Sequence, residues 1–154
     1  MALRKVEPVS TPVATIRQSC ATTLAALAGF RESRWPYDLL GLDPNGLVHK
    51  SFAVGVGRTI PVNLDRQVPS VGVYSETEVF VRFLWRLRAD NMRADYDLAV
   101  AGENALVVAL VADPPDNRIT FRQVVGRVVE PIAEGKNYFV GTIQFGVHHH
   151  YALS

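Results

Sequence analysis

Three consecutive histidines near the end of the sequence, His148–His150, are the residues best suited to chemistry. Alternate side chains of a strand lie on the same side, so His148 and His150 would bring two imidazoles together on one strand. Imidazole nitrogens are common zinc ligands, but a metal centre needs one or two more, and the only other histidine is His49. We therefore interpret the triplet as the polar end of a strand. A metal-dependent enzyme using the His148/His150 pair is the alternative from a different functional class.

Other reactive side chains have structural explanations. Cys20 is the only cysteine, which excludes an intramolecular disulfide and a cysteine-cluster zinc site, and its helical spacing predicts a core position. Asp95 and Asp97 are two residues apart, so they do not share a helix face, and stabilising a helix N-terminus explains them better than acid–base catalysis. Gly55-Val-Gly57 lacks the Lys-Ser/Thr pair of a phosphate-binding loop. We predict no catalytic residue, no cofactor, no metal and no enzymatic activity.

The strongest periodic pattern lies in residues 76–88, where apolar and charged side chains alternate. A period of two predicts a long strand with one face in the core. The face expected to be buried carries Thr77, Val79, Val81, Phe83, Trp85 and Leu87. The opposite face carries Glu76, Glu78, Arg82, Arg86 and Arg88. Because the acids partly offset the arginines, this face suits solvent or an interface with a copy of the same protein better than non-specific DNA binding.

Two segments have helical periodicity. Thr11 and Pro12 are typical of a helix start, and Gly29 of a helix end, so a helix is predicted to about residue 28. Its inward face would carry Val13, Ile16, Cys20, Leu24 and Leu27. After a loop at 89–93, with Asp95 as the helix-start residue, a second helix is predicted to 111. Its inward face would carry Tyr96, Val100, Val107, Leu110 and Val111, flanked by Ala99 and Leu106.

The remaining pattern predicts strands at about 49–56, 118–130 and 137–150. Asp43-Pro44-Asn45-Gly46 is typical of a tight turn. We expect residues 1–10 to form an extended arm and residues 58–69, with Arg58 and Arg66, to form a loop or protruding arm that contacts other chains. The order of elements predicts a single α+β domain over 1–154, with two helices packed on a mainly antiparallel sheet.

Composition excludes some classes of protein. The 154 residues are 48% hydrophobic and 20% charged, as in ordinary globular domains. The net charge of +1 argues against strong non-specific attraction to nucleic acid or anionic membranes. No apolar run approaches the roughly 20 residues that span a bilayer. An Ala-rich N-terminal stretch loosely imitates a signal peptide, but prolines and charged residues interrupt it, so we expect no secretion.

One segment resembles a known family. Val79-Phe-Val-Arg-Phe-Leu-Trp-Arg-Leu-Arg88, a polar turn, and Asp95-Tyr-Asp-Leu-Ala-Val-Ala-Gly-Glu-Asn104 resemble the tail terminator (tail completion) proteins of long-tailed bacteriophages. Chain length and the helix–strands–helix–strands order are similar too. At the level of residues the resemblance covers 79–104, and as an overall plan it covers most of 11–150.

The resemblance implies a structural virion protein, assembled in the host cytoplasm and located in the tail or neck. Such subunits form a hexameric ring that caps the tail-tube protein, ends tube growth and provides the surface for joining the head, and the genome passes through the lumen without sequence-specific binding. A head–tail connector or head-closure protein of the neck is the alternative within this setting. From the strand pattern we expect subunit interfaces or the lumen to involve Glu76, Glu78, Arg82, Arg86, Arg88, Arg58 and Arg66.

Overall fold

The computed structural model describes residues 13–34, 48–61, 73–112, 120–131 and 138–151, and for 73–74, 120–131 and 150–151 it describes the backbone alone. The element order is α1 (Val13–Ala25), β1 (Arg31–Glu32), β2 (Ser51–Pro61), β3 (Val73–Arg86), α2 (Met92–Val111), β4 (Thr120–Pro131) and β5 (Tyr138–Tyr151). The predicted arm at 1–10, the turn at 43–46, residues 62–69 of the predicted loop and Arg66 lie outside the described residues.

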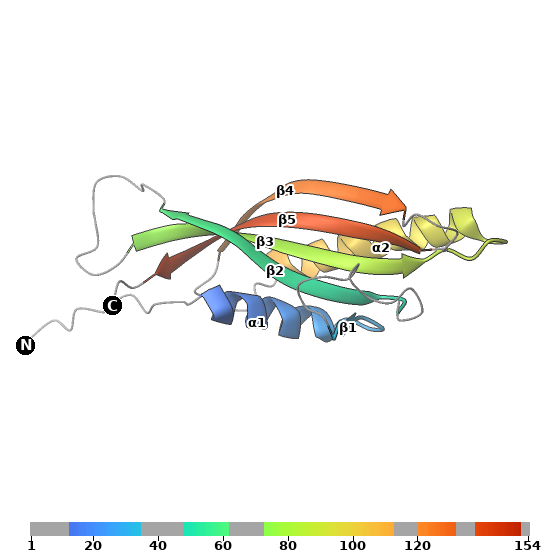
Figure 1. Ribbon diagram of the computed structural model, residues 1–154, viewed down its shortest axis with the longest axis horizontal. Helices are drawn as coiled ribbons and strands as arrows, with labels where there is room; N and C mark the ends of the chain where they lie inside the picture. The colour runs from blue at the N-terminus through green and yellow to red at the C-terminus, as the bar shows by residue number, and fades with distance from the viewer. Residues whose placement is uncertain (1–12, 35–47, 62–72, 113–119, 132–137, 152–154) are drawn as a thin grey trace, which may run out of the picture.

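The strands form one sheet in the order β1-β2-β3-β5-β4 (Figure 1). The short β1 runs parallel to β2, and all other neighbours are antiparallel. β3 lies in the middle and pairs with β5 along its whole length, from Val73 opposite Tyr151 to Arg86 opposite Tyr138. This pairing has no bulge, so alternate residues of the two strands stay on matching faces throughout.

Both helices pack on the same face of this sheet. The odd-numbered residues of β3 from Val79 to Trp85 are buried there with their β5 counterparts, as the alternation predicted. Ile16, Cys20 and Leu24 of α1 and Ala99, Leu106 and Leu110 of α2 join them in one apolar cluster. The predicted α+β fold, with two helices on a mainly antiparallel sheet, is therefore confirmed.

The second helix differs from its prediction in start and orientation. α2 begins at Met92, and Tyr96, Val100 and Val111 are 46%, 37% and 43% exposed rather than buried. The face turned to the sheet carries small residues, among them Gly102, above which the Trp85 ring lies so close that a Cβ would collide with it. Small residues let the helix axis approach the sheet, and this close approach determines which side of the helix is buried.

Two other predicted boundaries are wrong. β2 continues to Pro61, so the first four residues of the predicted loop 58–69, including Arg58, belong to a strand. β2 continues past its two glycines because a bulge between Val56 and Thr59 lets its later residues pair with β3 again. The first helix ends at Ala25 rather than 28, although Gly29 has the positive φ of 82° expected of a residue near a helix end.

Packing of β3 against β5 depends on Gly141, which lies opposite Phe83. A Cβ at Gly141 would collide with the Phe83 ring, whereas a Cβ at Gly55 of β2 would meet no atom within 4 Å. We expect Gly141→Ala to destabilise the fold by about 1–3 kcal/mol through overpacking. Gly55→Ala is the matched control and should stay within about 0.5 kcal/mol of the parent. Urea unfolding of both variants measures the difference, and equal stabilities would contradict the Phe83–Gly141 packing.

Candidate assembly surfaces

The face of β3 turned away from the helices carries most of the predicted site residues, and we call it the charged face. Glu76, Glu78 and Arg82 are half-buried on it, and Arg86 is exposed. The sequence therefore correctly predicted that these four side chains share a face. Arg88 does not belong to it, because β3 ends at Arg86 and the Arg88 side chain turns back to α2.

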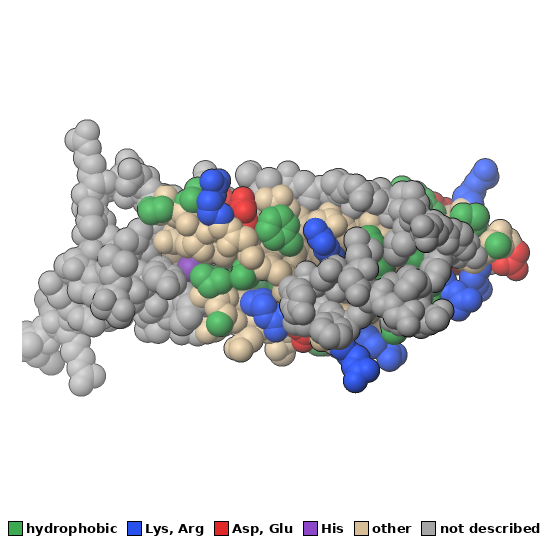
Figure 2. All heavy atoms as spheres, in the orientation of Figure 1, with side chains coloured by type: hydrophobic (Ala, Val, Ile, Leu, Met, Phe, Trp, Pro, Cys, Tyr) green, Lys and Arg blue, Asp and Glu red, His purple; other side chains and the backbone are tan. Residues whose placement is uncertain are grey.

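Apolar residues interrupt the charged face near the end of β3. Leu84 is fully buried there, and with Ala53 and Val140 it forms a second, smaller cluster against which Tyr138 packs. On the face drawn in Figure 2, lysine and arginine side chains are scattered among acidic and apolar ones within the described residues. This mixture agrees with the predicted strip of both signs rather than with a uniformly basic surface.

The acidic part of the charged face lies towards the start of β3. Glu76 Oε2 is 3.4 Å from Nε2 of His148 on β5, an ion pair when the imidazole is protonated. Glu78 Oε2 accepts a hydrogen bond of 3.3 Å from the backbone amide of Arg58, beside the bulge of β2. Glycine allows this arrangement, because a side chain at Gly146 would collide with the Glu76 carboxylate.

The histidine triplet does not bring two described imidazoles together. His148 lies on the charged face, whereas its neighbour His149 is fully buried on the helix side of the sheet. His149 Nε2 is 2.7 Å from Oγ1 of Thr77, which is 2.7 Å from Oγ1 of Thr59. Among the residues that the structure describes, no three His, Cys, Asp or Glu side chains are grouped so that they could hold a metal ion. The side chain of His150 is not among them.

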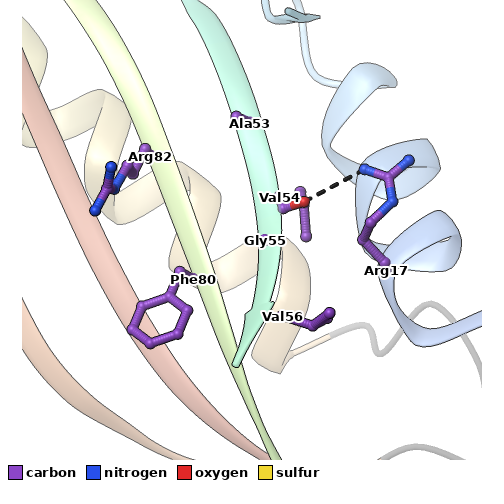
Figure 3. A pocket seen from close by; sticks show the side chains of 7 residues that line it. All are labelled: Arg17, Ala53, Val54, Gly55, Val56, Phe80 and Arg82. Carbon is purple, nitrogen blue, oxygen red and sulfur yellow. Dashed lines mark hydrogen bonds between the residues drawn. The ribbon is translucent and has the colours of Figure 1, made fainter. Parts of the chain in front are cut away.

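A hollow lies over β2, next to its outer edge (Figure 3). It has a volume of about 380 Å³ and is lined by Arg17, Ala53, Val54, Gly55, Val56, Phe80 and Arg82. Arg17 reaches it from α1, donates a hydrogen bond of 3.3 Å to the carbonyl of Val54 and pairs with Glu32 at 3.0 Å. Phe80 and Arg82 project from β3 on the other side of the strand. Side chains from both faces of the sheet therefore meet at this edge.

Sequence reasoning missed Arg17 as a functional candidate. The one available signal was a cation next to Ile16 on the apolar side of the predicted helix, where a charged group needs a partner. By contrast, Cys20, one turn further along, lies fully in the core as predicted. Burial raises the pKa of its thiol to about 12, despite the opposing influence of Arg17, so the sulfur stays protonated and unreactive.

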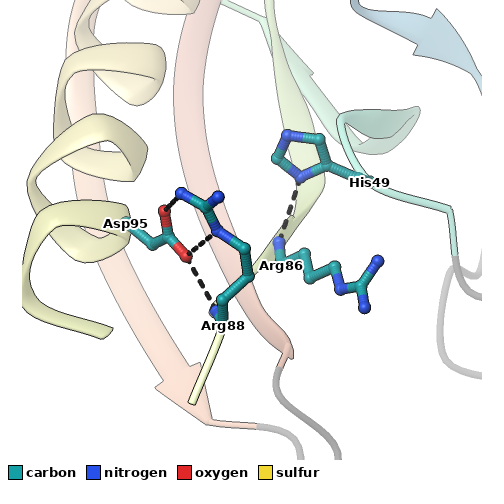
Figure 4. Close-up of polar contacts among 4 residues, drawn as sticks. All are labelled: His49, Arg86, Arg88 and Asp95. Atoms are coloured by element: carbon teal, nitrogen blue, oxygen red, sulfur yellow. Dashed lines mark hydrogen bonds and ion pairs between the residues drawn. The ribbon is translucent and has the colours of Figure 1, made fainter. Parts of the chain in front are cut away.

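Where β3 ends, Arg88 and Asp95 form a clasp between the strand and α2 (Figure 4). Asp95 Oδ2 accepts hydrogen bonds from the backbone amide of Arg88 at 2.7 Å and from its Nε at 3.0 Å. Asp95 Oδ1 accepts a third hydrogen bond, from Nη2 of Arg88, at 2.9 Å. The Asp95 side chain is only 6% exposed. Hydrogen bonds from Arg88 lower the pKa of this carboxyl to about 2 and raise the pKa of the guanidinium. The aspartate in the first turn therefore anchors the loop to the helix.

His49 lies beside this clasp and contacts the edge of the Trp85 ring, with ring centroids 4.8 Å apart. Burial and the nearby charge of Lys50 lower the pKa of His49, which favours the neutral imidazole. Its Nδ1 accepts the backbone amide of Arg86 at 3.1 Å. Lys50 lies over the same Trp85 ring, 5.1 Å from its centroid. The Arg86 guanidinium extends away from these contacts and leaves a charge at the surface (Figure 4).

The surface of α2 is unusually apolar. Among the described residues, most of the exposed large hydrophobic side chains belong to this helix, namely Met92, Tyr96, Leu98, Val100, Val108 and Val111. Several lie on the side that the sequence predicted to be buried, which identifies a second candidate contact surface. None of the helices described is long and apolar enough to cross a membrane.

Comparisons with models of known protein families and with curated proteins find no match to this chain. Function must therefore be argued from the residues, the fold and the surfaces described above.

The clasp makes a prediction about acid stability. The pKa of Asp95 lies below its ordinary value of 3.8 in the folded protein, so its stabilising effect is complete above about pH 4 and is lost as the pH falls towards 2. We expect Asp95→Asn to lower the melting temperature at pH 6, with the deficit shrinking between pH 4 and 2. Asp97→Asn, at an exposed position of the same helix, should show little change at either pH. A pH-independent deficit in Asp95→Asn would contradict this role of the charge.

Proposed function

We propose that this chain is a structural subunit of a long-tailed phage virion, a tail terminator that forms a ring on the end of the tail tube. The ring would end tube growth and present the surface for joining the head. Its partners would be further copies of the same chain, the tail-tube protein and the connector proteins of the neck, and the genome would pass through its lumen.

The observation that carries the proposal is the folding of residues 79–104. The strand part of this resemblance includes the second half of β3, and the helix part lies within α2, which packs on that strand. The resembling residues thus belong to one packed unit at the centre of the α+β fold rather than to scattered surface positions. The clasp between Arg88 and Asp95 joins the two parts.

The surfaces support self-assembly. Glu76, Glu78, Arg82 and Arg86 present both signs of charge on one face, which suits contacts between identical subunits. The exposed apolar side chains of α2 provide a second surface whose burial would favour association. A ring needs two different surfaces on each subunit, because head-to-tail contacts close a ring only when unlike patches meet.

The first test is the mass of the purified protein, measured by native mass spectrometry with and without the tail-tube protein. We expect rings of about six copies, or a monomer that assembles only when tube protein is present. A monomer or dimer that ignores tube protein would contradict the terminator function. Assembly with portal-proximal proteins in place of tube protein would favour the connector alternative.

Charge reversal at Arg86 tests the charged face. The Arg86 guanidinium makes no described bond that stabilises the monomer, because its contact with His49 uses the backbone amide. We expect Arg86→Glu to keep the melting temperature and to raise the assembly midpoint concentration at least tenfold, about 1.4 kcal/mol. Arg34→Glu, exposed after β1, makes the same charge change off this face and off α2. Equal assembly of the two variants would assign the charged face to solvent.

A further inference from the structure

Among the described residues, backbone pairing covers the outer edge of β2 only at its beginning. The amides of Arg31 and Ser33 donate to the carbonyls of Lys50 and Phe52, at 3.2 Å and 2.7 Å. Two residues further on, the carbonyl of Val54 accepts the guanidinium of Arg17 instead of a backbone amide. Arg17 thus takes the place of the next amide along the edge. Beyond it, no described strand pairs with this side of β2.

The backbone groups that point outward beyond Val54 follow from the register. Alternate residues of a strand direct their N–H and C=O groups to the same edge, so those of Val56 face outward as well. The bulge adds one residue to β2, and Thr59, opposite Thr77, is the next outward residue. Pro61 follows and has no N–H to donate. The edge therefore offers hydrogen-bonding groups at Val56 and Thr59, between Arg17 at one end and Pro61 at the other.

A hollow lies over β2 at the same place. The hollow of about 380 Å³ borders Val54, Gly55 and Val56, and a Cβ at Gly55 would meet no atom within 4 Å. Val56 is 39% exposed at the rim of the core. On the other side of the strand, Phe80 and Arg82 line the hollow. An added strand would thus find backbone partners along this edge, as strand addition requires, and the hollow would leave room for its side chains over β2.

A second copy of the chain provides a strand of the right direction. β2, β3, β5 and β4 alternate in direction, so β2 and β4 at the two sides of this sheet run antiparallel. When copies stand side by side in the same orientation, β4 of one therefore meets β2 of the next as an antiparallel neighbour. β4 extends over 12 residues, Thr120–Pro131, and pairs with no described strand except β5.

We propose that β4 of a second copy pairs with β2 at Val56 and Thr59, and that Arg17 and Pro61 limit the length of this pairing. The contact joins two different edges, so it is head-to-tail and can close into a ring. This inference rests on the proposed ring function, since it names the contact that would hold neighbouring subunits together.

Proline at Val56 tests the contact, because it removes an outward N–H while leaving the pairing of β2 with β3 intact. We expect Val56→Pro and Val56→Ala to melt at similar temperatures, both retaining the fold. Assembly, followed by light scattering against concentration, should weaken at least tenfold more in Val56→Pro than in Val56→Ala. The alanine variant removes the side chain and keeps the donor, so the comparison isolates the backbone contact.

Hydrogen exchange of the unaltered protein gives a second measurement, which does not depend on how the variants fold. The amides of Val56 and Thr59 should exchange rapidly in the monomer and at least tenfold more slowly in the assembly. Unchanged exchange at both amides, or equal assembly of the two Val56 variants, would overturn the strand contact and leave the ring function standing. A parent protein that never assembles, with or without tube protein, would overturn both.

Discussion

The unbroken pairing of β3 with β5 is the constraint on which the other elements depend. Every residue of β3 from Val73 to Arg86 has a partner on β5, so neither strand can shift without moving its apolar side chains to the wrong face. Phe83 over Gly141 fixes this alignment sterically, because the large ring fills the space that the glycine leaves. The helices then cover one face, and the charged residues are restricted to the other.

At the end of β3, an ion pair stabilises the chain next to an apolar contact. Trp85 is buried between the sheet, His49, Lys50 and the glycine of α2, and the chain must then turn back sharply to form the helix. Asp95 stabilises that turn by accepting hydrogen bonds from both the backbone amide and the guanidinium of Arg88. A carboxylate in the first turn of a helix also suits the helix dipole. One aspartate thus stabilises both the helix start and the connection that leads to it.

Periodicity predicted the buried face of β3 well, because the alternation from Thr77 to Trp85 has one physical solution. It failed where contacts distant in sequence decide the outcome. Tyr96 and Val100 fit an inward helical face, yet close packing of Gly102 on Trp85 rotates the helix away from them.

The candidate surfaces were harder to predict for the same reason. Glu76 meets His148 only through the register of two strands that are far apart in sequence. The contact of Arg17 with β2 could not be predicted, because no local sequence pattern shows that its helix lies beside that strand. Arg58 was assigned to a loop, because the two glycines and the proline around it disguise a bulged strand.

A sheet edge that can pair with another chain must balance assembly against aggregation, and β2 contains devices that limit pairing. A bulge, a cation on an edge carbonyl and a proline are each means by which proteins prevent indiscriminate strand addition. Arg17 and Pro61 lie on either side of Val56 and Thr59, and the bulge lies between these two residues. An edge open to unlimited pairing would carry none of these devices. The combination fits a short contact that is specific for one neighbour, as a closed ring of identical subunits requires.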